Sequence, residues 1–486
     1  MIVSPEAEAP LNIPSFRDPA GFVFRQEDRI LRVVNPAWVP GLEAFLQTRT
    51  AREGTRSGRL VRSTRSLRSD AGELGAHADY IIEHERIPFP AYPYEWPPEM
   101  LHAAAALTLD FARQALEEGF GLKDATPYNV LFRGSQPVFV DVLSFERRDP
   151  ADGIWMAYGQ FVRTFLLPLM ASRYFGFPLS GVLGSPRDGL EPETLYRWAG
   201  WRRRLMPRFL SLVSLPKWIA LCERAGASRY HRKPADSPEE ARFVVEGILK
   251  SCQRHLAALE PREINSSAGT GNASTWSGYL DGKSIYTPGQ LVQKEVFVAE
   301  ALALAKPRTV LDVGANEGHF SFLAARQGCS VVAIDSDPVV TGSIWRRAAR
   351  ERYDVLPLVV DLTRPTPAIG WRNLECASFL DRARGGFDLV MMLAVIHHML
   401  VTERVPLEDL LALAAELTRE YLLIEFVAPE DPMFQRIVRG REELYAHLTH
   451  SRFEAAAAQR FELVRTMQID GLHRWLYLFR RRRAAG

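Results

Sequence analysis

The sequence predicts an α/β protein whose C-terminal half folds as a parallel sheet covered by helices. Beyond residue 306, short apolar segments typical of buried strands alternate with segments of helical pattern, which is the rhythm of a parallel α/β sheet. The last two strand-like segments are joined only by Gly471 and its neighbours, too few residues for a crossover helix, so they should pair antiparallel. A small, polar segment at 265–275 has the composition of a flexible connector and separates this half from the first half.

Length and composition bound the organisation of the chain. Its 486 residues predict two or three domains, and we expect an N-terminal domain at 1–264, a linker at 265–275 and a C-terminal domain at 276–486. The formal net charge of +2 makes nucleic acid an unlikely partner, and no apolar run reaches the roughly 18 residues of a membrane span. The N-terminus lacks the features of a secretory signal, and the four cysteines are widely separated. We therefore expect a cytoplasmic protein without a metal site or a disulfide framework.

The N-terminal half predicts an α+β domain. Residues 20–34 have the pattern of a strand hairpin, and residues 97–119 that of a long helix with proline at its start and glycine at its end. A second hairpin is expected at 129–145, turning at Gly134-Ser135, and residues 154–259 are mostly of helical pattern.

The C-terminal half predicts strands and helices in alternation. Strands are expected at 307–314, 330–337, 353–362, 387–396, 420–429, 461–470 and 474–482, and helices at 318–328, 339–352 and 406–418.

A glycine-spaced turn follows the first of these strands. Such a turn, between a strand and a helix, places backbone N–H groups and a helix N-terminus at one point, where ligands bind in open α/β sheets. The spacing Asp312-x-Gly314-x-x-x-Gly318 lacks the lysine and hydroxyl of a Walker A loop. It also lacks the middle glycine that lets a pyrophosphate approach the backbone in dinucleotide-binding folds.

The spacing resembles motif I of the class I S-adenosylmethionine (SAM) methyltransferases, and the resemblance covers about residues 277–482. It implies a Rossmann-like seven-stranded sheet with an antiparallel last strand, and SAM as the cofactor. In such a site Asp335 would accept the ribose hydroxyls and Asp361 would meet the adenine amino group. The resemblance gives a predicted cofactor-binding set of Asp312, Gly314, Asn316, Gly318, Asp335, Asp361, Leu362 and Ala394.

Residues just before the first strand are candidates to cap this pocket. Trp276, Tyr279, Tyr286 and Lys294 lie in or before a helix predicted to start at Pro288. An aromatic ring can lie against a sulfonium by cation–π attraction. The alternative is that the aromatic rings pack on the edge of the sheet.

The acceptor side is predicted at the end of the fourth strand. His397 and His398 follow it directly, and histidine has a pKa suited to a general base near neutrality. One of the pair would deprotonate an acceptor oxygen; the alternative is that both are structural. No Asn/Asp-Pro-Pro-Tyr sequence stands here, which disfavours an exocyclic amino group as acceptor. Glu425 ends the fifth strand at the same edge and is a candidate to shape the acceptor pocket.

The segment 122–146 carries a second, weaker resemblance, to kinase-like and aminoglycoside-phosphotransferase-like domains. Asp124 and Asn129 have the spacing of a kinase catalytic loop, and Asp141 follows a hairpin where the metal-binding aspartate would stand. The resemblance implies Mg²⁺-ATP as a possible second cofactor. No lysine precedes Lys123, however, and an arginine such as Arg32 replaces the phosphate-gripping lysine imperfectly. We expect a degenerate kinase-like platform; the alternative is that Asp124 and Asn129 only fix turns.

Two arginine-rich segments stand out in the N-terminal half. Residues 49–68 place seven arginines at spacings of three or four, either on one helical face or in a basic loop, and would suit an anionic acceptor or only solvent. Residues 197–208 mix aromatic residues with arginines, which favours a surface amphipathic helix over a nucleic-acid contact.

Together these observations predict a methyltransferase that acts on an oxygen, less readily a nitrogen, of a small-molecule or glycan acceptor. In general layout the chain resembles methyltransferase-like proteins linked to nodulation or to decoration of cell-surface glycans. A bifunctional kinase-methyltransferase and a non-catalytic SAM-binding scaffold remain alternatives, and the oligomeric state is open.

Overall fold

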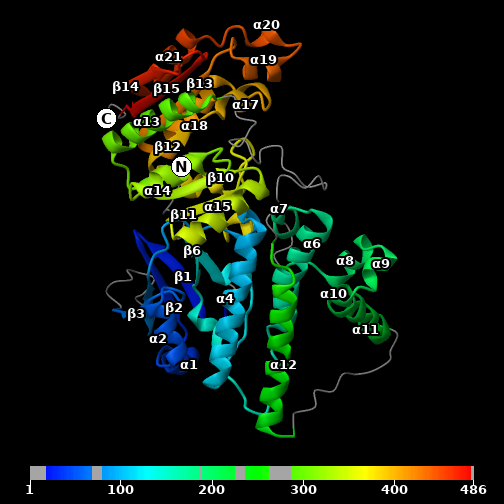
Figure 1. Cartoon of the computed structure of the whole chain (residues 1–486). Helices are drawn as coiled ribbons and strands as arrows, with labels where there is room; N and C mark the ends of the chain where they lie inside the picture. Colours follow the sequence, from blue (N-terminus) through cyan, green and yellow to red (C-terminus); the bar gives the residue numbers. More distant parts are fainter. Residues whose placement is uncertain (1–17, 68–78, 185–187, 225–235, 262–285, 483–486) are drawn as a thin grey trace, which may run out of the picture. The chain divides into compact units, whose positions relative to one another are not determined.

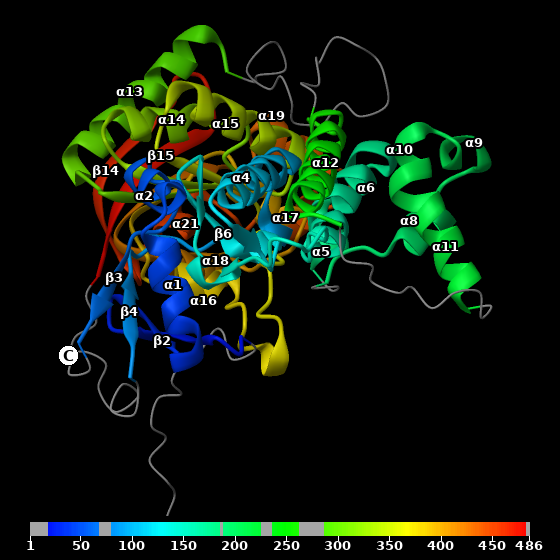
Figure 2. The same cartoon turned by 90° about the horizontal axis from the view of Figure 1, so that it is seen from below.

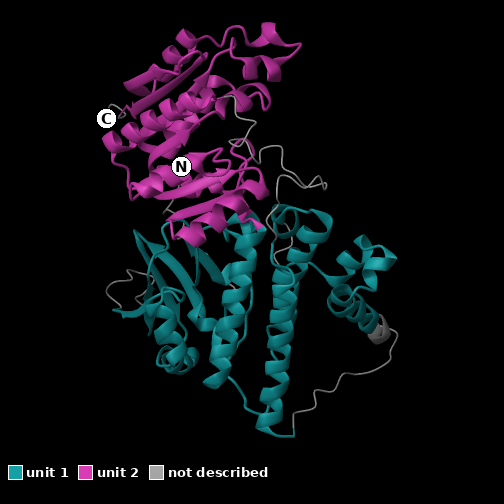
Figure 3. Cartoon of the chain, viewed as in Figure 1, with its two compact units in different colours: residues 1–94, 98–261, 368–377 teal, residues 95–97, 262–367, 378–486 magenta. Residues whose placement is uncertain are grey.

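The computed structural model describes residues 18–67, 79–184, 188–224, 236–261 and 286–482 (Figure 1). The chain divides into two compact units (Figure 3). Unit 1 comprises residues 1–94, 98–261 and 368–377, and unit 2 comprises residues 95–97, 262–367 and 378–486. The expected linker at 265–275, together with Trp276 and Tyr279, lies outside the described residues. The domain limits therefore remain a prediction.

Unit 2 is built on one sheet, which has seven strands in the described part of the chain. The strands are β9 (Thr309–Val313), β10 (Ser330–Asp335), β11 (Val355–Val359), β12 (Phe387–Met392), β13 (Thr418–Val427), β14 (Phe461–Gln468) and β15 (Arg474–Arg481). Their order is β11-β10-β9-β12-β13-β15-β14. The first five are parallel, whereas β15 runs antiparallel to both β13 and β14, which confirms the predicted closing hairpin.

Helices cover both faces of this sheet (Figure 2). They are α13 (Pro288–Ala305), α14 (His319–Arg326), α15 (Pro338–Glu351), α16 (Phe379–Ala383), α17 (Ile396–Val401), α18 (Leu407–Leu417), α19 (Pro432–Val438), α20 (Glu442–Tyr445) and α21 (His450–Ala458). Phe297 of α13, Phe322 of α14 and Ile344 of α15 share one apolar cluster with strand residues, so these three helices cover the same face. The central strands are buried on both faces, which explains why β9 and β12 are apolar apart from Thr309 and Asp312 in β9 and Asp388 in β12.

Unit 1 contains a four-stranded antiparallel sheet in its described part, in the order β1-β2-β4-β3. Its strands are β1 (Gly21–Gln26), β2 (Arg29–Val34), β3 (Ser63–Ser66) and β4 (Ile81–His84). Two smaller pairs join β5 (Phe120–Leu122) with β8 (Phe145–Arg147), and β6 (Val130–Arg133) with β7 (Gln136–Phe139). Both hairpins expected in this half, β1–β2 and β6–β7, are confirmed.

The remainder of unit 1 is helical. Its helices are α1 (Val39–Leu46), α2 (Arg49–Arg56), α4 (Pro98–Glu117), α5 (Tyr158–Phe161), α6 (Leu167–Phe175), α7 (Leu179–Leu183), α8 (Pro192–Trp198), α9 (Trp201–Arg204), α10 (Pro207–Phe209), α11 (Leu215–Arg224) and α12 (Pro238–Ala257). The long helix expected at 97–119 is α4. None of the described helices is long and apolar enough to cross a membrane.

The two arginine-rich segments differ from expectation. Residues 197–208 are not one amphipathic helix, because Gly200 and Met206 have extended backbone angles and divide the segment among α8, α9 and α10. Pro207 explains the second break, since the residue before a proline is disfavoured in helical geometry. In the other segment, Arg49 pairs with Glu117 and Arg59 with Asp110. This segment is divided between α2 and β3, so its arginines do not share one helical face.

Candidate SAM and acceptor site

A cavity of about 230 Å³ opens at the carboxyl ends of β9, β10, β11 and β12, within unit 2. This is the sheet edge at which the sequence predicted a ligand. The predicted site residues that line the cavity are Asp312, Gly314, Asn316, Asp335, Asp361, Leu362, Ala394 and His398. Two predicted residues, Gly318 and His397, do not line it.

The turn after β9 is held close to its neighbours. Gly314 has φ = 71°, and a Cβ placed on it would lie 2.8 Å from Cγ2 of Val395. The N–H groups of Gly314 and Ala315 both donate to the carbonyl of Ile334, at 2.9 and 3.0 Å. Only glycine satisfies this conformation and this spacing, so the first motif glycine brings bare backbone to the cavity wall.

The second motif glycine has a different task. Gly318 has φ = 79° at the start of α14, and a Cβ there would lie 2.9 Å from Cγ1 of Ile344. It permits close packing of α14 against α15, and its predicted contact with the cofactor finds no support in the lining of the cavity.

Asp335 ends β10 at the cavity. Its carboxylate accepts the N–H of Asn316 at 2.9 Å through Oδ2 and the N–H of Asp337 at 3.0 Å through Oδ1. Burial raises the pKa of Asp335, while these hydrogen bonds favour the charged form. These bonds hold the carboxylate in one orientation at the wall of the cavity, where its oxygens can accept hydroxyl groups of a ligand.

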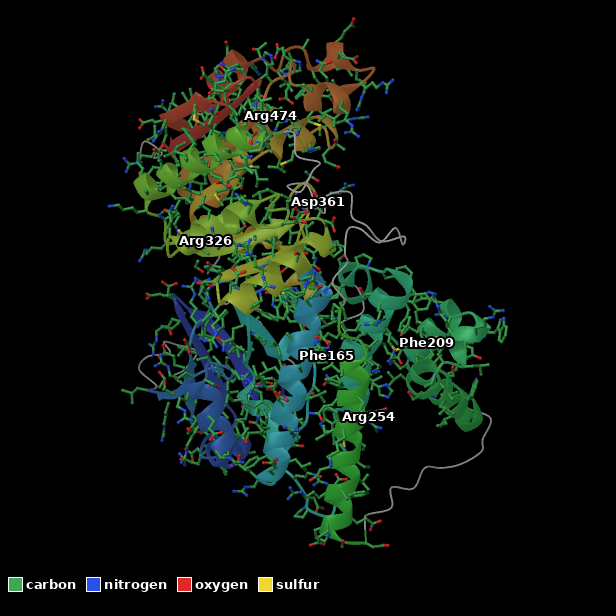
Figure 4. All side chains as sticks on the ribbon, in the orientation of Figure 1. Phe165, Phe209, Arg254, Arg326, Asp361 and Arg474 are labelled. Atoms are coloured by element: carbon green, nitrogen blue, oxygen red, sulfur yellow. The ribbon has the colours of Figure 1, made fainter. Side chains whose placement is uncertain are left out.

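Asp361 follows β11 and also faces the cavity (Figure 4). Its Oδ1 accepts both the N–H of Thr363, at 2.9 Å, and the hydroxyl of that residue, at 2.6 Å. These bonds and the guanidinium of Arg364 lower the pKa of Asp361 in spite of partial burial. The carboxylate is thus ionised and fixed in direction.

Asp312, the motif acid, is more deeply buried. Ser321 donates to its Oδ2 at 2.5 Å, yet burial raises the pKa of Asp312 to about 6, and the nearby charge of Asp335 adds to the effect. Close by, Oδ1 of Asn316 is buried without a hydrogen-bond partner among the described residues, and Asn316 lines the cavity. A buried polar atom without a hydrogen-bond partner and two acidic side chains suit a ligand that is cationic and carries several hydrogen-bonding groups.

The two histidines at the start of α17 lie in different surroundings. His398 lines the cavity, and burial together with the charge of Arg474 lowers its pKa. His397 is 2% exposed, and its Nδ1 has no hydrogen-bond partner within the described residues. Burial lowers the pKa of His397 well below its ordinary value, and the two rings lie 4.2 Å apart between centroids. Of the pair, His398 lines the cavity and His397 does not.

A buried ionic network lies behind the cavity. Lys294, which lines the cavity, pairs with Glu425 at 2.6 Å, and Glu425 accepts the hydroxyl of Tyr286 at 2.5 Å. Arg474 pairs with Asp431 at 2.8 Å and donates to the Tyr286 hydroxyl at 2.6 Å. The two cations lower the pKa of Glu425 despite its full burial.

This network changes the expected role of Glu425 and extends the expected set. Glu425 does not line the cavity, so it holds Lys294 in place instead of shaping the acceptor pocket directly. Tyr286 and Lys294 line the cavity as expected. Sequence reasoning missed Arg474 and Asp431. No local pattern marks either as buried, because their partners lie far away in the chain.

Comparison with known proteins decides the family. A family model described as a methyltransferase domain matches residues 291–479. Nodulation protein NoeA of Rhizobium meliloti (strain 1021) is 30% identical over 475 residues, which cover 96% of this chain and 95% of that protein. This chain belongs to the NoeA family. A protein-L-isoaspartate O-methyltransferase of Methylorubrum extorquens (strain PA1) is 32% identical over 135 residues, 27% of this chain and 55% of that protein.

Two solved structures give weaker matches. NodS, an N-methyltransferase of Bradyrhizobium japonicum WM9 in complex with S-adenosyl-L-homocysteine, is 14% identical with a TM-score of 0.31, over 42% of this chain and 92% of that chain. The bifunctional kinase-methyltransferase WbdD is 20% identical with a TM-score of 0.30, over 42% of this chain and 41% of that chain. At these scores neither structure supports an argument about this protein.

The C-terminal unit of this NoeA-family protein is therefore a SAM-dependent methyltransferase domain. The described residues fit the cofactor. Acidic side chains, a turn in which Gly314 exposes its backbone, and an amide oxygen without a hydrogen-bond partner lie together at one edge of the sheet. When bound there, SAM would supply an activated methyl group on a positively charged sulfur.

The similarity to NoeA also spans unit 1, where the kinase-like residues were predicted. Asp141 pairs with Arg32 at 2.5 Å and accepts the hydroxyl of Ser144 at 2.5 Å, and Asn129 donates to that same hydroxyl oxygen at 3.0 Å. Burial raises the pKa of Asp124. Among the described residues no group of histidines, cysteines and carboxylates could hold a metal ion. The predicted metal aspartate is thus neutralised by an arginine, and Mg²⁺-ATP finds no support here.

Proposed function

We propose that the protein transfers the methyl group of SAM to an oxygen of a small-molecule or glycan acceptor, with His398 as the general base. The observation that carries the proposal is the position of His398. It lines the SAM cavity at the start of α17, immediately after the turn in which Ala394 and Val395 close that cavity.

The protonation state of His398 suits this role. Burial and the charge of Arg474 lower its pKa below the ordinary value of 6.5, so the imidazole is neutral at physiological pH, which is the charge state that a general base requires. A hydroxyl or carboxylic acid must lose its proton when an oxygen accepts a methyl group. The remaining residues position the reactants: Asp335 and Asp361 orient the cofactor, and the Gly314 turn lets the backbone approach it.

Two further observations favour oxygen over nitrogen as the acceptor atom. The residues after β12, Leu393 to Ile396, offer no side-chain amide or carboxylate that would hold an amino group. One of the curated relatives is by name an O-methyltransferase. The name of the NoeA relative associates it with nodulation, and we extend that process, together with a glycan or small-molecule acceptor, to this protein as part of the proposal.

The two alternatives are less well supported. A second, phosphotransferase activity would need Asp141 to hold a metal ion, yet Arg32 already neutralises that carboxylate. A scaffold without catalysis would have no need of a neutral histidine at the cavity. ATP-dependent thermal stabilisation that is lost in Asp141→Ala would restore the first alternative.

The proposal is tested by methyl transfer from isotopically labelled SAM to three sets of acceptors, which bear hydroxyl, carboxyl or amino groups and include oligosaccharides. Mass spectrometry locates the label. We expect label on oxygen, and we expect His398→Ala to lower kcat by about 10²- to 10⁴-fold while SAM binding is unchanged. His447→Ala, which removes an exposed histidine of the same unit, is the matched control and should keep full activity. Label on nitrogen, or wild-type kcat in His398→Ala, would overturn the assignment.

A further inference from the structure

The helices α8 to α11 form a lobe of unit 1 that contributes no residue to the cavity at the sheet edge of unit 2. In Figures 1 and 2 they lie together beyond α6 and α12, on the side away from the β1–β4 sheet. The lobe is well packed inside: Phe209 is fully buried and meets Tyr174 edge-on at 5.1 Å and Phe175 at 6.2 Å between ring centroids (Figure 4). The aromatic side chains packed inside the lobe therefore fix the positions of the helices that carry its outer residues.

The outer surface of this lobe carries large apolar side chains that the interior leaves outside. We call it the Trp201 patch, comprising Phe177, Trp198, Trp201, Leu205 and Met206. Trp201 is 69% exposed and Leu205 is 61% exposed. These two residues are four positions apart across α9 and its C-cap, so they project from the same side of the turn. The ring of Phe177 lies 4.7 Å from that of Trp198, which makes the patch continuous with the loop after α6.

The stretch that carries the patch is basic. Residues 196–220 contain six basic residues and no acidic residue, while the acidic residues of the lobe, Glu193 and Glu223, stand nearer its ends in the sequence. The guanidinium of Arg202 lies 5.3 Å from the ring centroid of Trp201, and that of Arg203 lies 5.1 Å from that of Phe175. Arg202 and Arg203 are exposed, so one cationic group stands beside the exposed indole ring of Trp201 and a second beside the ring of Phe175.

We propose that the Trp201 patch binds the surface of an anionic lipid bilayer. Tryptophan is favoured at the boundary between headgroups and acyl chains because its ring is apolar and its N–H is polar, while leucine and methionine enter the apolar side. Arginine can extend its apolar stem along that boundary and leave its charge among anionic headgroups. Since none of the described helices can span a membrane, this association is peripheral.

Other occupants fit the patch less well. Leu205 and Met206 are also exposed, at 61% and 41%, and neither can stack on a nucleic-acid base. A second copy of the chain, docked through the same patch, would add the positive charges of its own Arg202 and Arg203 to those of its partner within one interface, and like charges oppose such a contact.

The test is co-sedimentation of the full chain with vesicles of phosphatidylcholine alone and of phosphatidylcholine with about one third phosphatidylglycerol. We expect binding to the anionic vesicles that weakens as salt rises from about 0.1 M to about 0.5 M, because the headgroup charge is screened. Trp201→Ser with Leu205→Ser should reduce the partition coefficient about tenfold or more, and so should Arg202→Glu with Arg203→Glu.

Phe243→Ser is the matched control, since Phe243 is 76% exposed on α12 of the same unit but lies near acidic residues of that helix. It should leave vesicle binding unchanged. Circular dichroism and SAM binding confirm that each variant is folded. The proposal is overturned if the wild-type chain stays in the supernatant, if both vesicle types bind equally, or if the control weakens binding as much as the patch variants. Binding of duplex DNA or RNA that competes with vesicles, or a dimer that the Trp201→Ser variant dissolves, would assign the patch to those partners instead.

Discussion

Replacement of the motif acid by its amide should make the ligand-free protein more stable at neutral pH. Burial raises the pKa of Asp312 from 3.8 to about 6, with the charge of Asp335 as a further cause. Each pKa unit corresponds to about 1.4 kcal/mol, so keeping this carboxylate charged costs the folded state about 3 kcal/mol at pH 7.5 and about 1.5 kcal/mol at pH 5. Asp312→Asn removes that cost, and its amide oxygen can still accept the hydroxyl of Ser321.

The sign follows from proton binding. Between about pH 4 and pH 6 the folded state binds more protons at Asp312 than the unfolded state does, so the wild-type protein loses stability as pH rises through that window. Asp312→Asn lacks this loss. The gain in unfolding free energy should therefore grow from about 1.5 kcal/mol at pH 5 to about 3 kcal/mol at pH 7.5.

The assay is urea unfolding at both pH values. The transition of unit 2 is identified as the one that added SAM shifts to higher urea concentration, and it is then followed without SAM. Asp388→Asn is the matched control at the opposite end of the same sheet. Asp388 accepts the N–H groups of Arg308 and Thr309 at 2.9 and 3.1 Å, and its pKa is lowered. Its stabilising contribution is lost only as pH falls through acid values, so Asp388→Asn should destabilise equally at pH 5 and pH 7.5. A pH-independent effect of Asp312→Asn, or destabilisation by it at pH 7.5, would refute the reasoning.

Three further predictions follow from the site. Gly314→Ala places a Cβ 2.8 Å from Val395 at φ = 71°, so it should destabilise unit 2 by about 1–3 kcal/mol and weaken SAM binding in calorimetry; an unchanged melting temperature would contradict this. Glu425→Gln leaves Lys294 buried without its anionic partner and should lower the free energy of unfolding by about 3–5 kcal/mol, measured in urea. The added change Lys294→Met should restore much of that free energy, and a loss below about 1 kcal/mol in Glu425→Gln would argue against the network. For His398 the acid limb of the kcat–pH profile should lie below 6.5, because its pKa is lowered, and a limb at or above that value would exclude it as the base.

The sequence predicted the sheet of unit 2 well because its signals are local. Largely apolar strands, glycine at the motif turn and the short connection around Gly471 each reflect a nearby physical requirement. Asp312, Asp335 and Asp361 were placed at the cavity for the same reason, since the carboxyl ends of parallel strands meet at one edge.

Other features depend on contacts between distant residues. Arg474 meets Asp431, 43 positions away, and Tyr286, 188 positions away, and nothing in its neighbourhood distinguishes it from a surface arginine. His397 and His398 are adjacent in sequence, and α17 directs one into the interior and the other to the cavity, a difference that the position of the helix alone decides. Gly318 fits the motif but serves the packing of α14 against α15.

The central claim is that the sheet edge carrying Asp335 binds SAM. Calorimetric titration with SAM tests this claim most directly, when the full chain and its Asp335→Ala variant are compared. Unfolding followed by circular dichroism confirms that the variant is folded. The account predicts one SAM site per chain, with affinity lowered at least tenfold in the variant, about 1.4 kcal/mol. Absence of SAM binding, or equal affinity in the folded variant, would contradict it.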